Sequence, residues 1–204
     1  MRRMCFLLST LLLSGCFGVS ATVVIRANGA GSITMEYHIS QTLESLGKQD
    51  GNERYPPIPV GKVDFERTVN RIPGLRLRSF SAKTVGTDVV TQVRMDFSTT
   101  DALLTFFDAQ GGRASLNEVS GKQHLSFILS EGPAKLDPDL QNLVNEVTAG
   151  YTISMTFNLP RTGELRLTDS AGNLIPGQSS SGTTLSFSVP VSGALNGLQA
   201  DILW

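Results

Sequence analysis

Apolar and polar residues alternate along four long stretches of the chain. A period of two leaves one apolar side and one polar side, which predicts strands of an antiparallel sheet covered on one face. Shorter apolar stretches over residues 75–82, 125–129 and 165–168 predict further strands, and strand-forming sequence starts near Thr22. The apolar positions of the long stretches are Ile33, Met35, Tyr37 and Ile39; Val89, Val93, Met95 and Phe97; Tyr151, Ile153, Met155, Phe157 and Leu159; and Leu185, Phe187, Val189 and Val191.

Three other segments repeat apolar residues at helical spacing. Thr100 is suited to cap the second segment, and Asp137 followed by Pro138 is suited to open the third. The apolar positions are Phe65, Val69 and Ile72; Leu103, Phe106 and Phe107; and Leu140, Leu143, Val144 and Val147. The sequence therefore predicts an α+β fold, a largely antiparallel sheet with about three short amphipathic helices packed on one face.

The connections are predicted from their turn-forming residues. Residues 83–88, which include Gly86, read as a hairpin turn between two strands. Residues 47–61 and 169–182 are polar and rich in glycine and proline, and both are expected to be long loops.

The composition is that of a globular domain. Apolar residues make up 40% of the chain and charged residues 17%, a balance that excludes a disordered chain. No run of like charge occurs, so a nucleic-acid partner is not expected.

The N-terminus has the pattern of a secretory signal. Arg2 and Arg3 precede an apolar run from Cys5 to Leu13. This run is far shorter than the ~20 residues that a membrane-spanning helix needs, but it suits the apolar part of a signal peptide.

The end of that run, Leu13-Ser14-Gly15-Cys16, resembles the lipobox of bacterial lipoproteins. The resemblance implies cleavage between Gly15 and Cys16 and a lipid on the Cys16 thiol. It divides the chain into a signal peptide (1–15), a lipidated N-terminus with a short tether (16–21) and one domain (22–204). An ordinary signal peptide with a chance cysteine is the alternative.

Lipidation would use the one cysteine that remains after cleavage, because Cys5 lies in the signal. The mature domain is then expected to have no disulfide, no thiolate metal site and no cysteine nucleophile. Two or three acyl chains hold a protein on a membrane almost permanently, since each buried CH2 contributes about 0.8 kcal/mol. The expected location is the bacterial cell envelope, on a membrane facing the periplasm or the cell exterior.

Few residues are suited to catalysis or metal binding. His38 and His124 fall on polar strand faces, and two solvated histidines are expected there. A metal site shared by the two is the weaker alternative, because no third ligand is evident. Asp137 and Asp139 flank a proline at a helix start, where capping and the helix dipole explain them. Asp101 and Asp108 lie at the two ends of a short helix, and neither pair has the apolar setting that suits a carboxylate to acid–base catalysis.

Motifs for nucleophilic catalysis or phosphate binding are also incomplete. No Gly-x-Ser-x-Gly sequence occurs, and Gly29-Ala30-Gly31 lacks the following Lys and Ser or Thr of a phosphate loop. A β-bulge before the first long strand is the preferred explanation of those glycines. We therefore expect a non-enzymatic protein with no cofactor and no metal.

Several segments resemble the LppM-type domain of bacterial lipoproteins. The matching segments cover most of residues 29–190 and are Gly29-Ala30-Gly31-Ser32-Ile33-Thr34-Met35-Glu36-Tyr37-His38-Ile39-Ser40; Asp64-Phe65 with Ile72-Pro73-Gly74-Leu75 and Thr87-Asp88-Val89-Val90; and Thr156-Phe157-Asn158-Leu159-Pro160 with Gly182-Thr183-Thr184-Leu185-Ser186-Phe187. The resemblance implies an envelope-anchored α+β domain that binds an amphipathic lipid or glycolipid. It carries over no catalytic residue.

Two functional hypotheses follow. In the first, the apolar strand faces bind the acyl part of an amphipathic lipid or glycolipid, with Met95, Phe97, Met155 and Phe157 in contact with it. In the second, the chain is a structural or interaction protein, or a surface antigen, that uses a loop or a sheet edge such as the face of Arg76, Arg78 and Phe80; its protein partners are unknown. An enclosed apolar cavity would favour the first hypothesis, and a solid core the second.

Overall fold

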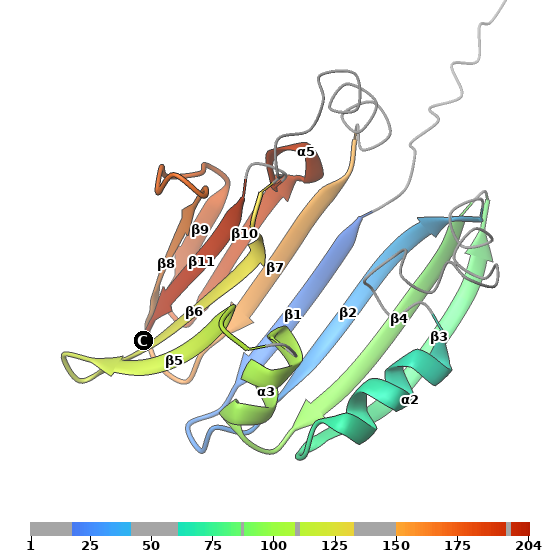
Figure 1. The fold of residues 1–204 in the computed structure, drawn as a ribbon, viewed down its shortest axis with the longest axis horizontal. Coiled ribbons are helices and arrows are strands. Elements are labelled where there is room, and N and C mark those ends of the chain that lie inside the picture. Colours follow the sequence, from blue (N-terminus) through green and yellow to red (C-terminus); the bar gives the residue numbers. More distant parts are fainter. Residues whose placement is uncertain (1–17, 42–60, 87, 109–110, 133–149, 195–196) are drawn as a thin grey trace, which may run out of the picture.

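The computed structural model describes residues 18–41, 61–86, 88–108, 111–132, 150–194 and 197–204. In these ranges the chain forms two sheets and short helices (Figure 1). The large sheet has the strand order β3-β4-β2-β1-β7-β10-β9, and the small sheet has the order β5-β6-β11-β8. The strands are β1 (Val19–Ile25), β2 (Gly31–Ser40), β3 (Leu75–Val85), β4 (Asp88–Phe97), β5 (Ala114–Val119), β6 (Lys122–Ser130), β7 (Thr152–Asn158), β8 (Glu164–Thr168), β9 (Gln178–Ser181), β10 (Thr184–Pro190) and β11 (Leu198–Leu203); the helices are α2 (Lys62–Arg71), α3 (Thr100–Phe107) and α5 (Val191–Ala194).

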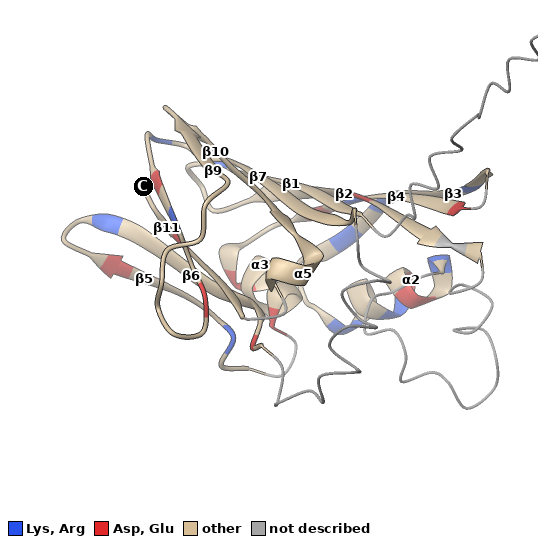
Figure 2. Ribbon diagram, turned by 90° about the horizontal axis from the view of Figure 1, so that it is seen from above, with Lys and Arg blue, Asp and Glu red and all other residues tan. Residues whose placement is uncertain are grey.

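The described elements form an α+β fold, as predicted. β1 and β7 pair in parallel, whereas the other pairs in both sheets are antiparallel. Figure 2 shows α2, α3 and α5 on one side of the large sheet, with the small sheet inclined against the same side. The hydrophobic core lies between these layers and draws on both sheets.

The period-two pattern located the strands that build the core. The four long alternating stretches are β2, β4, β7 and β10, and the shorter ones are β3, β6 and β8. The sequence prediction assigned no residues to strands β5, β9 and β11 or to the short helix α5. Residues 169–182 are not loop throughout, because β9 lies among them; its four residues are polar and exposed, so no hydrophobic alternation marks it.

β1 begins earlier than the sequence suggested. It starts at Val19, not near Thr22, and Ala21 is already buried. Val19 pairs with Tyr37 of β2 on one side and with Ile153 of β7 on the other. Backbone pairing on both sides extends the strand through Ser20 and Ala21, which are weak strand formers, so residues 19–21 belong to the sheet and not to a tether.

The turn between β1 and β2 explains the glycines of that segment. Arg26 N donates to Ala30 O at 2.8 Å, and Gly29 has a φ of 78°. The register runs through β1 and β2 without a shift, so the expected bulge is wrong. A Cβ on Gly31 would lie 2.2 Å from Cζ of Phe97, so only glycine lets this ring pack on the backbone.

A bulge occurs instead in β3. The register with β4 shifts directly after Leu77, so the extra residue, Arg78, reverses the facing of the side chains that follow. Phe80 turns inwards, and its ring centroid lies 5.9 Å from that of Phe65. The expectation that Phe80 is exposed together with Arg76 and Arg78 is therefore wrong: the two arginines are exposed, but Phe80 is half-buried.

The first two predicted helices are confirmed. Phe65 anchors α2 in the core, and Leu103 anchors α3. The cap of α3 is Thr99, whose hydroxyl accepts from Ala102 N at 3.3 Å, and not Thr100 as expected. The predicted helix after Asp137 and most of the predicted loop 47–61 lie outside the described residues.

Candidate functional site

The four residues predicted to contact an apolar ligand all lie in the core. Met95, Phe97, Met155 and Phe157 are 0%, 2%, 4% and 0% exposed, respectively. They share the inner face of the large sheet. Met95 and Phe157 lie in one row of that face, separated by one residue each of β2 and β1.

Aromatic rings fill the space where the two sheets meet. Phe127 of β6 stacks on Phe107 at a centroid distance of 4.9 Å and contacts Phe157 at 5.6 Å. None of the four predicted residues lines either of the two clefts described below. Their contact with an acyl chain therefore stays a prediction, and it would require packed rings to separate.

The larger cleft, here called the β11 cleft, lies on the outer face of the small sheet. Its volume is about 460 Å3. β11 runs along its centre, between β6 and β8, and the loop after β8 closes one end. Its polar lining includes Ser130, Glu131, Arg166, Asp169, Gln199 and Asp201.

Side-chain hydrogen bonds hold the centre of the β11 cleft. Asp201 Oδ1 lies 3.0 Å from His124 Nε2, and Gln199 Nε2 donates to Asp201 Oδ2 at 3.2 Å and to Ser126 Oγ at 3.3 Å. His124 points away from the core as expected, but only 29% of its side chain is exposed. It is therefore a fixed partner of Asp201 and not the solvated residue that was expected.

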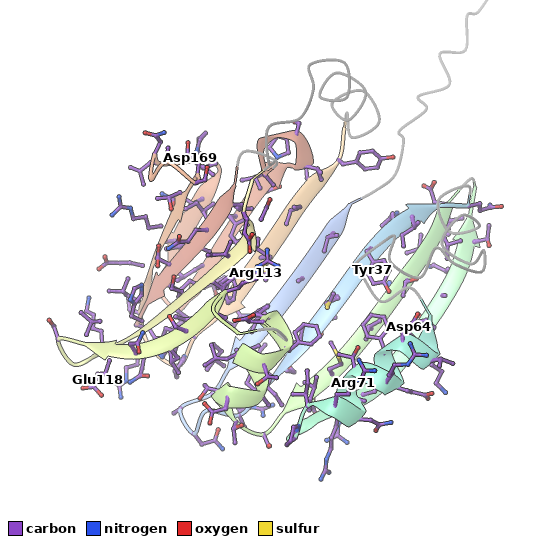
Figure 3. All side chains as sticks on the ribbon, in the orientation of Figure 1. Tyr37, Asp64, Arg71, Arg113, Glu118 and Asp169 are labelled. Atoms are coloured by element: carbon purple, nitrogen blue, oxygen red, sulfur yellow. The ribbon has the colours of Figure 1, made fainter. Side chains whose placement is uncertain are left out.

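The other two carboxylates of the β11 cleft are also partnered. Asp169 Oδ1 accepts from the backbone N–H groups of Ala171 and Asn173, both at 2.9 Å. Its Oδ2 accepts from the Asn173 side chain, and these Asn173 bonds lower the pKa of Asp169. Glu131 forms an ion pair with Arg113 at 3.2 Å. Figure 3 places Asp169 beyond the end of β8.

Arg166 differs from these groups. It is exposed on β8 and lines the cleft, and its Cα pairs with that of Asp201 in the register of β8 and β11. The Asp201 carboxylate, however, bonds with His124 and Gln199. Within the described part of the chain, the guanidinium of Arg166 has neither an ion-pair partner nor a hydrogen-bond acceptor.

The smaller cleft, here called the β1 cleft, surrounds the start of β1. Its volume is about 170 Å3, and it is lined by the first residues of β1 and by Glu36, His38, Thr152 and Ser154. Glu36 accepts a hydrogen bond from Gln92 at 2.6 Å and lies 3.2 Å from His38 Nε2. Both hydrogen bonds lower the pKa of Glu36, and the bond from Gln92 has the larger effect.

The remaining sequence candidates do not gather into a reactive centre. His38 lies in the large sheet and His124 in the small one, so the two do not share a strand pair. Asp108 ends α3 and accepts from the backbone N–H groups of Gly111 and Ala114, which is a structural role. In the described ranges, no three His, Cys, Asp or Glu side chains are grouped to hold a metal ion.

The lipobox residues and Cys16 lie outside the described residues, as do Asp137 and Asp139. Of the helices that the structure describes, none is long and apolar enough to cross a membrane.

Sequence reasoning missed the residues of the β11 cleft. Residues 198–203 do alternate, because Leu198, Ala200 and Ile202 are buried while Gln199 and Asp201 face outwards. This alternation could have predicted β11 from the sequence. It could also have predicted that Gln199 and Asp201 form a row of polar side chains on the outer face of that strand. Nothing in the sequence marked Arg166 as a neighbour of that row, since the pairing of β8 with β11 is long-range.

Comparisons with known proteins bear on the fold. No family model matches the sequence, and no curated protein matches it. The structure is similar to the NMR structure of the folded domain of LppM from Mycobacterium tuberculosis, with a TM-score of 0.50, 15% sequence identity, and coverage of 92% of this chain and 89% of that chain. The expected likeness to an LppM-type domain is therefore confirmed at the level of the fold.

Proposed function

We propose that this chain is a non-enzymatic lipoprotein of the bacterial cell envelope, anchored through an acylated Cys16. The lipobox pattern and the fold shared with the LppM domain support this proposal. Because β1 begins at Val19, only Phe17 and Gly18 separate the anchor from the sheet. Three peptide steps of ~3.3–3.6 Å keep that end of β1 within roughly 11 Å of the lipidated residue.

The ligand that fits this arrangement is an amphipathic lipid or glycolipid whose headgroup enters the β1 cleft. The observation that carries the proposal is the position of that cleft at the anchored end of β1. Its hydroxyl groups, with Glu36 and His38, are suited to a headgroup rich in hydroxyls. The acyl chains would stay in the bilayer, so no apolar cavity is needed and the packed core is no obstacle.

We expect the domain beginning at Gly18 to bind vesicles made of the envelope lipids of its native host. Sedimentation should find the domain bound to the vesicles, and the vesicles should raise its melting temperature. His38→Ala removes one hydrogen-bonding group and should weaken lipid binding on the order of tenfold, the value of one good hydrogen bond. His124→Ala, in the small sheet, is the matched control and should bind normally. If no lipid is bound and added lipid does not raise the melting temperature, the lipid-binding proposal is wrong.

A protein-interaction role is the second candidate, and two observations favour it. The four residues predicted to contact a lipid lie in a packed core, which is the outcome expected of an interaction protein. The second observation concerns the edge of the large sheet. β3 is an edge strand of eleven residues, with Arg76, Arg78 and Lys83 exposed along it. Long edge strands offer unpaired backbone groups to a partner, although the bulge and the charges on β3 are features that also discourage such pairing. If the lipid experiment fails, this edge is the surface to examine.

A further inference from the structure

The β11 cleft brings outward side chains from three strands together. Gln199 and Asp201 come from β11, Ser126 and Ser130 from β6, and Arg166 from β8. On the opposite side of β11, Leu198, Ala200 and Ile202 are buried in the core. The cleft floor is therefore fixed by a packed sheet, and Gln199 and Asp201 are held in place by hydrogen bonds before any ligand arrives. Such pre-organisation lowers the entropy cost of binding.

The charged side chains of the cleft differ in whether they already have a partner within the protein. Glu131, Asp169 and Asp201 all have partners in the structure, whereas Arg166 lacks one among the described residues. A guanidinium with free donors matches the two oxygens of a carboxylate. The cleft lining carries three carboxylates against the one guanidinium of Arg166, and of these carboxylates only Glu131 is paired with an arginine, Arg113, in the part of the chain that the structure describes. This excess of negative charge disfavours a doubly charged phosphate and favours a ligand that also carries a positive group.

We infer that the β11 cleft binds a small zwitterionic ligand, an amino acid or a short peptide with free termini. Its carboxylate contacts Arg166, and its ammonium group faces the carboxylates of Glu131 and Asp201. Gln199 and Ser130 are placed to bond with amide groups between the two ends. This inference does not depend on lipid binding at the β1 cleft, because the two clefts share no residue.

Titration of the full chain in detergent with the tripeptide Ala-Ala-Ala tests the inference by calorimetry. We expect saturable binding that is weakened at least tenfold by N-acetylation and by C-terminal amidation, since each removes one of the two charges. The Arg166→Gln variant should lose at least ~10-fold in affinity. Arg161→Gln removes another exposed arginine, outside the cleft, and should bind like the parent protein.

Three results would overturn the inference. They are no heat of binding at millimolar tripeptide, equal affinity of Arg166→Gln and the parent, and tighter binding of inorganic phosphate than of the tripeptide. Arg166 is exposed, so its substitution is not expected to unfold the protein. A circular dichroism spectrum matching that of the parent protein will confirm this for each variant.

Discussion

Replacing Phe157 with alanine will lower the free energy of unfolding by about 3–5 kcal/mol, the usual cost of removing a buried aromatic ring. Phe157 is 0% exposed, and its ring contacts Phe127 of the small sheet at 5.6 Å. The substitution therefore opens a cavity where the two sheets join. Urea unfolding of the domain that begins at Gly18 measures the effect, with Trp204, the one tryptophan of the chain, as the fluorescent probe.

The matched control is Val63→Ala on α2, because Val63 is 64% exposed. We expect that substitution to change the unfolding free energy by less than ~0.5 kcal/mol. The experiment also separates a core from a ligand pocket. A loss below ~1 kcal/mol for Phe157→Ala, or one that added lipid cancels, would show that this region is a binding cavity and not packed core.

Cys16→Ser will abolish acylation and leave the signal peptide uncleaved by the lipoprotein peptidase. In the proposed lipoprotein the modified thiol is that of Cys16, and the other cysteine, Cys5, lies within the proposed signal. Metabolic labelling with a palmitate analogue should mark the parent protein and not the variant. Cys5→Ser is the control and should label normally.

The fold of the Cys16→Ser protein should be unchanged, because the described domain contains no cysteine that could form a disulfide. Urea unfolding of its released domain should match that of the parent protein. Equal labelling of Cys16→Ser and the parent would mean that the acylated residue is not Cys16. The proposal that Cys16 anchors the domain close to the membrane would then be wrong.

Strands could be predicted where one buried face makes apolar and polar residues alternate along the sequence. β2, and β4 from Thr91 onwards, place apolar residues on one side only, so the alternation of Ile33 or Met95 with polar neighbours was sufficient. β5 and β9 lie at sheet edges, where β9 is fully exposed and only Ala114 and Leu116 of β5 are half-buried, too few to mark a strand. Phe80 was misplaced because a bulge reverses facing without leaving a clear sequence signal.

The candidate sites were harder to predict than the strands. Met95 and Phe157 were correctly placed on an apolar face, but sequence alone does not separate a packed core from a cavity. The β11 cleft depends on the pairing of β11 with β6 and with β8, contacts between residues far apart in the chain. Arg166 and Asp201 are ordinary exposed-face residues until that pairing brings them side by side.

The central claim is that the anchored end of β1 faces the lipid headgroups, and photo-crosslinking in vesicles tests it most directly. A photoreactive residue in place of Ser154 lies in the β1 cleft, and one in place of Glu118 lies at the far end of the β5–β6 hairpin (Figure 3). The account predicts lipid adducts at position 154 and none at position 118 when the acylated protein sits in vesicles of its native lipids. Adducts at position 118 with none at position 154 would contradict it.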